Sequence, residues 1–419
     1  MKTKLTDESY RFPTESTQDV LSRILREGAR KMLEQAVEEE VNVYLKEREH
    51  LKDAENHQQV VRNGYLPQRP FLTGLGPIQV QQPRVRDRRS PCDRERFTSE
   101  ILPRYLRKAP NMEALIPWLY LYGISTEAFP RALEALIGPG VSGLSATTIT
   151  RLKSQWEQEQ KQWANRSLEG RQYVYVWADG VYFNIRLEEE GNDRQCILVL
   201  MGATQSGEKE LIAISDGYRE SEQSWKELLL GCKDRGLRVD PKLAIGDGAL
   251  GFWAAVEKVW PETKGQRCWV HKTANVLNKM PKHIQPKAKG MLHDLWRAET
   301  KKEANKAFDL FLAAFGVKHP KATECLEKDR ERLLTFYGFP AEHWKHLRTT
   351  NPIESVFASV RLRTNKTKGS GSRAACLAMV FKLFEVAEKN FNKLSGVSLL
   401  PNVVAGRIYV DGIEEKIAA

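Results

Sequence analysis

Apolar residues recur every three or four positions over residues 16–48, from Val20 to Val41. This spacing predicts one amphipathic helix or a pair of helices. An apolar face of this length needs a surface to pack against. Residues 1–58 are therefore predicted to form a helical region that packs or dimerises.

The pattern changes over residues 59–110, where short strand-like runs are separated by glycine and proline. Basic residues there alternate at period two, which places Arg84, Arg86 and Arg88 on one side of a strand. Between Arg84 and Lys108 the chain has nine basic and four acidic residues. We interpret the segment as β-rich and able to contact phosphate, although a solvated loop would show the same charges.

Residues 111–168 show helical spacing again, interrupted at Gly138-Pro139-Gly140. The helix expected after this break contains Thr147, Thr148 and Arg151. Two helices around a glycine-rich break are typical of a helix-turn-helix, whose second helix enters a DNA groove. An ordinary helical hairpin has the same pattern, and both interpretations stay open.

Strand-like runs dominate residues 169–271, and helical runs separate only the later ones. Several strands in succession followed by strand-helix alternation predict a mixed α/β domain, in the order that a ribonuclease-H-like core would give. The strand-like runs are 173–179, 181–187, 196–203, 211–215, 242–247 and 266–270, and the helical runs are 221–235 and 249–260.

Strand signals stop after this region. Residues 272–345 are helix-rich, and from Lys264 to Lys306 there are eleven Lys or Arg against three acids. We predict an all-helical insertion here. Residues 346–419 would then return to the core and end in a C-terminal tail.

Composition adds a charge imbalance. The 419-residue chain carries a net charge of +11 with a pI near 9.2, which favours an acidic partner such as nucleic acid. DNA binding is therefore a second interpretation for residues 1–58. The longest apolar run, near residues 114–124, contains a proline and is too short for a bilayer, so no membrane partner is expected. The six cysteines are scattered, which is typical of reduced thiols in a cytoplasmic protein.

Three acids stand out by their position. Asp179 and Asp247 lie near the ends of predicted strands, and Glu354 lies at a predicted helix start. Each has an ordinary structural explanation. The two aspartates precede glycine, a favoured turn dipeptide, and Glu354 could complete a capping box with Asn351 as N-cap and Pro352 at the first helical position.

Taken together, the three acids suggest chemistry. Strand ends of an α/β sheet gather functional residues, and three carboxylates could bind two Mg²⁺ ions roughly 4 Å apart for phosphoryl transfer. Between Lys345 and Arg373 there are seven basic residues, and Glu354 is the single acid. Arg361 follows Glu354 by about two helical turns and so lies on the same face.

Several motifs resemble those of the Mutator-like DDE transposases of bacterial insertion sequences, and the resemblance spans nearly the whole chain. The motifs are Arg62-Asn63-Gly64-Tyr65, Pro83-Arg84-Val85-Arg86, Trp177-Ala178-Asp179-Gly180-Val181-Tyr182, Gly246-Asp247-Gly248-Ala249-Leu250-Gly251-Phe252-Trp253, Gln266-Arg267-Cys268-Trp269-Val270-His271-Lys272 and Arg348-Thr349-Thr350-Asn351-Pro352-Ile353-Glu354-Ser355.

The resemblance implies a ribonuclease-H-like catalytic core with a helical insertion. It also implies that Asp179, Asp247 and Glu354 are catalytic and bind two Mg²⁺ or Mn²⁺ ions per active site. Cys268 and His271 would support the site, as would Arg361. The residues expected to bind DNA are Arg84, Arg86, Arg88, Thr147, Thr148, Arg151, Lys272, Arg348, Arg363, Lys366 and Lys368.

The function that the resemblance implies is transposition. The protein would bind the terminal inverted repeats of an insertion sequence, cleave the 3′ ends, and join them to double-stranded target DNA, through a circular intermediate. It would act as a homodimer or larger homo-oligomer at the nucleoid, in the bacterial cytoplasm. Two alternatives are a structure-selective nuclease of the same fold and a non-catalytic DNA-binding repressor derived from a transposase.

Overall fold

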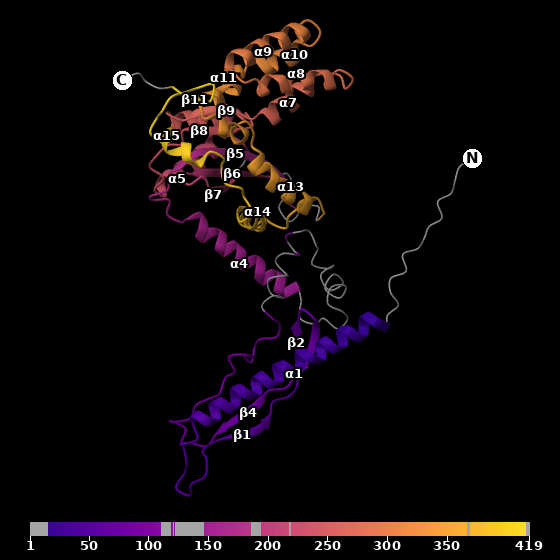
Figure 1. Cartoon of the computed structure of the whole chain (residues 1–419), viewed down its shortest axis with the longest axis vertical. Helices are drawn as coiled ribbons and strands as arrows, with labels where there is room; N and C mark the ends of the chain where they lie inside the picture. The colour runs from indigo at the N-terminus through magenta and orange to yellow at the C-terminus, as the bar shows by residue number, and fades with distance from the viewer. Residues whose placement is uncertain are drawn as a thin grey trace, which may run out of the picture. The chain divides into compact units, whose positions relative to one another are not determined.

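The computed structural model describes residues 16–109, 119, 121, 146–185, 194–217, 219–366 and 369–415. The chain divides into two compact units (Figure 1). The first comprises residues 1–120 and 124–150, and the second comprises residues 121–123 and 151–419. Most of the helix-turn-helix predicted within residues 111–168 lies outside the described residues.

The first unit is built on one long helix. α1 (Ser16–Glu47) confirms the helix predicted from the apolar spacing. β1 (Val60–Tyr65) pairs antiparallel with β4 (Pro83–Asp87), and β2 (Arg69–Thr73) pairs antiparallel with β3 (Gly76–Val80). The core between helix and strands contains Val37, Phe71, Ile78, Val80 and Leu102.

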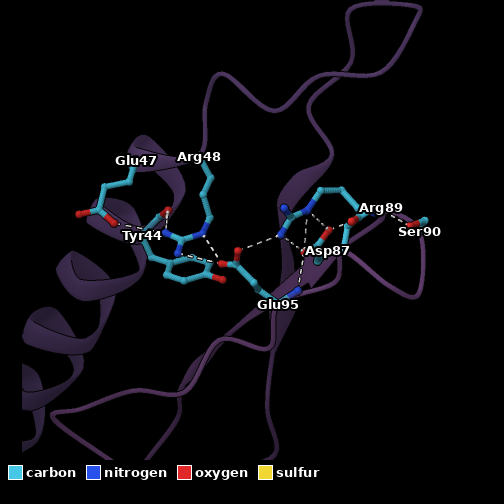
Figure 2. A network of polar contacts seen from close by, with 8 residues as sticks. Tyr44, Glu47, Arg48, Asp87, Arg89, Ser90 and Glu95 are labelled. Carbon is cyan, nitrogen blue, oxygen red and sulfur yellow. Dashed lines mark hydrogen bonds and ion pairs between the residues drawn. The ribbon is translucent and has the colours of Figure 1, made fainter.

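An ion-pair network joins the C-terminal end of α1 to β4 (Figure 2). The Arg48 guanidinium lies over the Tyr44 ring and donates to Glu95 at 2.9 Å. Arg89 in turn donates to Asp87 at 2.7 Å and lies 3.5 Å from Glu95. The Arg89 hydrogen bonds hold the pKa of the Asp87 carboxyl well below its usual range. Arg89 is thus committed to the scaffold.

The alternation predicted for this strand is observed. Arg84, Arg86 and Arg88 are exposed, while Val85 and Asp87 between them are half-buried. Side chains of a strand point to alternate faces, so the three arginines share the solvent face.

The second unit contains a five-stranded mixed sheet in the order β7-β6-β5-β8-β9. The first three strands form an antiparallel meander, and β8 and β9 run parallel to β5. The bounds are β5 (Tyr173–Asn184), β6 (Arg194–Thr204), β7 (Lys209–Gly217), β8 (Leu243–Gly246) and β9 (Lys264–Arg267).

One strand differs from the prediction. The runs 173–179 and 181–187 were expected to be separate strands, with Asp179-Gly180 as a candidate turn. Instead, residues 173–184 form the single strand β5, in which Asp179 pairs with Val199. β5 is central and bonded on both sides, so hydrogen bonding to β6 continues through the Asp-Gly pair and overrides its turn preference.

Two helices connect the later strands and supply one side of the core. α5 (Glu222–Asp234) follows β7, and α6 (Leu250–Val259) follows β8. Their indole and phenyl rings pack against sheet residues in one buried cluster. The cluster contains Trp225, Phe252, Trp253 and Trp260 from these helices and their ends, with Val176, Leu198 and Ala244 from the sheet.

Residues 268–350 contain helices and no strand. Figure 1 shows α7–α10 gathered beyond the β8–β9 edge, whereas α14 lies beside β7. These helices are α7 (Trp269–Leu277), α8 (Gln285–Arg297), α9 (Lys301–Phe315), α10 (Pro320–Glu327), α11 (Arg330–Leu333) and α12 (Trp344–Leu347), with the short turns η1 (Thr335–Gly338) and η2 (Ala341–His343).

The chain then returns to the sheet. α13 (Asn351–Lys366) contacts β5, and α14 (Arg373–Glu388) contacts β7. The remaining elements are α4 (Ala146–Ala164), η3 (Val397–Leu399), α15 (Leu400–Val404) and the hairpin of β10 (Tyr409–Val410) with β11 (Ile413–Glu414). Among the described helices, none has the length and apolar character needed to cross a bilayer.

Close packing inside the sheet gives a stability prediction. A Cβ at Gly202 of β6 would lie 2.5 Å from the Tyr173 ring and 2.6 Å from the Ile212 side chain, both buried. Gly202→Ala is therefore expected to lower the free energy of unfolding by about 1 to 3 kcal/mol. Urea denaturation of the full chain measures this.

The matched control is Gly290→Ala in α8, where a Cβ would meet nothing within 4 Å. This change should leave stability unchanged or raise it by up to about 1 kcal/mol, because alanine restricts the unfolded chain and favours helix. Equal stability of the two variants would contradict the packing described for β6.

Candidate active site

Two of the predicted acids come from neighbouring parallel strands. Asp179 lies within β5, and Asp247 directly follows β8. Ala178 pairs with Gly246 in the parallel register, so each acid is the residue after a paired position. The sheet therefore brings both acids to the same level, although 68 residues separate them in sequence.

The third acid lies in the first turn of α13. The Glu354 amide donates to the Thr350 carbonyl at 3.1 Å, so the helical bonding begins at Thr350 rather than at the predicted N-cap, Asn351. The Glu354 carboxylate bonds to His271 at 3.1 Å and to Arg361 at 2.6 Å. Its partners are thus side chains from elsewhere in the site, in contrast to the predicted capping box.

Glu354, Asp179 and His271 form one compact group. Each offers a ligand atom, and these atoms lie within 4.8 Å of one another. Asp247 is outside this group, but its charge acts on Asp179. Its Oδ1 accepts from the Ala249 amide at 2.9 Å.

Asp179 has the most unusual environment. Its side chain is 3% exposed, Oδ1 accepts from the Gly180 amide at 2.9 Å, and Oδ2 has no hydrogen-bond partner within the described residues. Burial raises the pKa of Asp179 to about 8, and the charges of Asp247 and Glu354 add to this shift while His271 opposes it. A buried carboxylate oxygen without a donor is costly unless a cation or proton satisfies it.

The Cys268–His271 pair links the strand of one acid to the helix of another. Cys268 is buried, its amide donates to the Gly246 carbonyl at 2.8 Å, and its thiol accepts from the Thr350 amide at 3.4 Å. Thr350 also contacts His271 Nδ1 at 3.4 Å. These bonds tie the end of β8 to the start of α13.

His271 is charged in this setting. Burial alone would lower its pKa, but hydrogen bonds to Cys268 and Glu354 outweigh burial and raise the pKa of His271 to about 11. The same contact with His271, together with Arg361, lowers the pKa of Glu354 to about 2. The imidazolium and the guanidinium therefore hold Glu354 ionised.

The donor set fits a divalent cation. Carboxylate oxygens suit Mg²⁺ and Mn²⁺, and imidazole suits transition metals such as Mn²⁺ better than Mg²⁺. The unpartnered Asp179 Oδ2 supplies an oxygen that a cation would satisfy. Asp179, Asp247 and Glu354 could thus hold metal, with the charged His271 as a neighbour that pairs with Glu354.

Some of the predicted DNA-binding residues are exposed or lie in the first turn or at the end of a helix, and others are packed inside the protein. Arg84, Arg86, Arg88 and Arg151 are exposed. Thr147 and Thr148 lie in the first turn of α4, and Lys366 is the last residue of α13. The predicted DNA contact of Lys368 lies outside the described residues.

Three predicted DNA contacts need correction. Lys272 is 1% exposed, forms an ion pair with Asp329 and donates to the Cys325 carbonyl at 2.6 Å. Arg363 is 4% exposed. Neither can reach phosphate in this structure, because the surrounding protein covers them.

Arg348 is the third. Its guanidinium lies among the rings of Trp296, Phe336 and Trp344, at 5.5, 4.5 and 5.2 Å from their centroids. Its carbonyl accepts from the Trp269 amide at 2.9 Å. These contacts indicate a structural role between α7 and α12.

Sequence reasoning missed one carboxylate at the site. Glu220, which lies between β7 and α5, packs against Gly180 beside Asp179. In the sequence, Glu220 is an acid that directly precedes Ser221, the N-cap of α5, and no motif around it indicates a functional site. Only the close approach of the two segments reveals it.

A mixed α/β protein with carboxylates gathered at adjacent strands and exposed arginines has the features of an enzyme that processes nucleic acid. The chain belongs to the Mutator family of transposases, whose family model matches residues 1–394.

Similar proteins are also named as transposases of insertion sequence elements. The chain is 50% identical over 301 residues to the transposase of insertion sequence element IS6120 of Mycolicibacterium smegmatis, covering 72% of this chain and 92% of the relative. It is 47% identical over 289 residues to the transposase of element IST2 of Acidithiobacillus ferrooxidans, covering 67% and 94%. The Drosophila P element transposase strand transfer complex has a TM-score of 0.26 at 10% identity over 71% of this chain and 85% of that chain, too low to inform the fold.

The correction for Lys272 gives a prediction. Lys272→Ala should lower the free energy of unfolding by about 2 kcal/mol, because the charged hydrogen bonds to Asp329 and Cys325 are lost. The matched control, Lys282→Ala, removes the same charge from an exposed side chain and should change stability little. Urea denaturation and DNA titration distinguish the roles: weaker DNA binding by Lys272→Ala without lost stability would restore the original interpretation.

Proposed function

We propose that this protein is the transposase of an insertion sequence, which binds the terminal inverted repeats, cleaves the 3′ ends and joins them to target DNA. Membership of the Mutator family supports transposition over a structure-selective nuclease or a non-catalytic repressor. The observation that carries the catalytic part is the approach of Glu354 to Asp179, from positions 175 residues apart in sequence.

The sheet and its helices would form a ribonuclease-H-like core. The antiparallel meander, the two parallel strands at its edge and the intervening α5 and α6 support this assignment. Residues 272–345 would be the helical insertion, since the chain leaves the sheet after β9 and contacts β5 again through α13. The core would thus comprise residues 169–271 and 346–419.

Asp179, Asp247 and Glu354 would bind two Mg²⁺ or Mn²⁺ ions. Bound ions of this kind activate an attacking oxygen and stabilise a leaving one. The protein's own contribution is to hold three carboxylates from separate segments in one place. His271 and Arg361 orient Glu354, because each pairs with one of its two carboxylate oxygens. Burial excludes water from the carboxylate of Asp179.

DNA would be held chiefly by the exposed arginines Arg84 and Arg86 of β4, Arg88 just after it and Arg151 of α4, together with Thr147 and Thr148 of α4. Lys366, the last residue of the helix that carries Glu354, and Lys368, two residues later in the sequence, would add phosphate contacts. Two element ends must meet, so a homodimer or larger assembly is proposed. The exposed apolar positions of α1, among them Leu21, Ile24 and Met32, are a candidate surface for it.

The same proposal includes the order in which the DNA ends are joined and the location of the protein in the cell. One cleaved 3′ end would first join beside the other end, giving a circular intermediate that is inserted later. The protein would act at the nucleoid of a bacterium.

Strand joining tests the catalytic residues. A pre-cleaved oligonucleotide carrying the terminal repeat should be joined to target DNA with Mg²⁺, and Asp179→Asn or Glu354→Gln should reduce the rate roughly 100-fold or more, because cation-binding charge is lost. Asp294→Asn, at an exposed position of α8, is the matched control and should join at the unaltered rate. Full activity of Asp179→Asn would exclude the proposed triad, and cleavage without joining would favour the nuclease.

Salt dependence tests the arginines of β4. Replacing Arg84, Arg86 and Arg88 together by alanine should reduce the slope of log affinity against log salt by about 2.7, if each contacts one phosphate. Fluorescence anisotropy with terminal-repeat DNA measures the slope.

The control replaces Lys318, Lys321 and Lys328, three exposed residues around α10, by alanine. It removes the same net charge, so an unaltered slope there would assign the effect to β4 itself. Equal slopes for the two triple variants would contradict contact by these arginines.

A further inference from the structure

Glu220 lies against the backbone of the candidate active site. A Cβ built on Gly180 would be 2.5 Å from Glu220 Cδ and 2.6 Å from its Oε1. The Glu220 carboxylate therefore occupies the space beside the Cα of Gly180, the residue that directly follows Asp179. The absence of a side chain at Gly180 is what permits this approach.

The backbone of Glu220 is fixed by its neighbours. It directly precedes Ser221, the N-cap of α5, whose side chain accepts from the Ser224 amide. A Cβ at Gly251 of α6 would overlap the Glu220 carbonyl oxygen, so the two helix starts are in contact there. Glu220 is consequently a positioned residue between two core helices.

Its surroundings are those of the cation site. Burial, and then the negative charge of Asp247, raise the pKa of Glu220 to about 7, while His271 opposes the shift. Both charged groups belong to the site already described. Glu220 thus approaches the site next to Gly180 and within reach of the Asp247 charge, whereas His271 and Arg361 bond to Glu354.

An independent feature points to a ligand here. Asp179 is 3% exposed and its Oδ2 has no hydrogen-bond partner in the described part of the chain. An oxygen of this kind adjoining further carboxylates is satisfied by a proton or by a bound cation. The arrangement resembles the all-oxygen surroundings that Mg²⁺ and Mn²⁺ take.

We propose that Glu220 is a fourth carboxylate of the divalent-cation site that Asp179, Asp247 and Glu354 would form. This rests on the proposed function, which assigns a metal site to the other three acids. Glu220 would add a hard oxygen ligand and a negative charge, and so strengthen cation binding on the Asp247 side.

The experiment is a Mn²⁺ titration of the full-length protein without DNA, in which electron paramagnetic resonance measures free Mn²⁺. Glu220→Gln keeps the size of the side chain and should weaken Mn²⁺ binding by about 10- to 100-fold. Glu222→Gln, two residues away and paired with Lys258, is the matched control and should bind like the unaltered protein.

A second variant leaves Glu220 in place. Gly180→Ala introduces the Cβ that would meet the Glu220 carboxylate and should displace it, with the same loss of Mn²⁺ affinity. The double variant should then bind no more weakly than Glu220→Gln alone. Unaltered thermal unfolding of both variants without Mn²⁺ would show that the fold is retained.

The outcomes separate the two proposals. If the unaltered protein binds Mn²⁺ and Asp179→Asn does not, the proposed metal site stands, and normal Mn²⁺ affinity of Glu220→Gln and Gly180→Ala would overturn the role of Glu220 alone. If the unaltered protein binds no Mn²⁺, both proposals fail.

Discussion

Repulsion among closely spaced carboxylates is the constraint on which the arrangement of the second unit depends. Asp179, Asp247, Glu220 and Glu354 come from four segments. The charges of Asp247 and Glu354 raise the pKa of the buried Asp179, and the charge of Asp247 also raises the pKa of Glu220. Two positively charged side chains, His271 and Arg361, offset part of this repulsion, and both form ion pairs with Glu354. The buried Asp179, by contrast, has one oxygen that receives no hydrogen bond from the residues that the structure describes.

The Cys268–Thr350–His271 cluster explains how the end of β8 and the start of α13, which are far apart in sequence, are held together. Cys268 receives the chain directly after β9 and bonds to the end of β8, while Thr350 ends the long helical segment and starts α13. The helices between them therefore leave and re-enter the unit at one point. Changes within residues 272–349, which exclude His271, need not disturb the acids, provided that this closure is kept.

The sequence predicted elements whose periodicity agrees with their packing, as α1 and β4 illustrate. It failed where tertiary contacts override local preference. The Asp179-Gly180 pair is typical of a turn, but pairing with Val199 and Leu198 of β6 keeps it within a strand. The sequence predicts that Lys272 is a surface base. In the structure it is buried, because it forms an ion pair with Asp329, 57 residues later. Glu220 has no local signal, because its position depends on the missing side chain of Gly180.

The order in which these segments occur along the chain has a consequence for biosynthesis. Glu354 lies 65 residues from the last residue, beyond all five strands of the large sheet and the helical segment. If the acids act together as proposed, a nascent polypeptide on the ribosome has its first two acids long before the third. Under that proposal, a chain that ends within the helical segment would contain Asp179 and Asp247 but lack the third acid, Glu354.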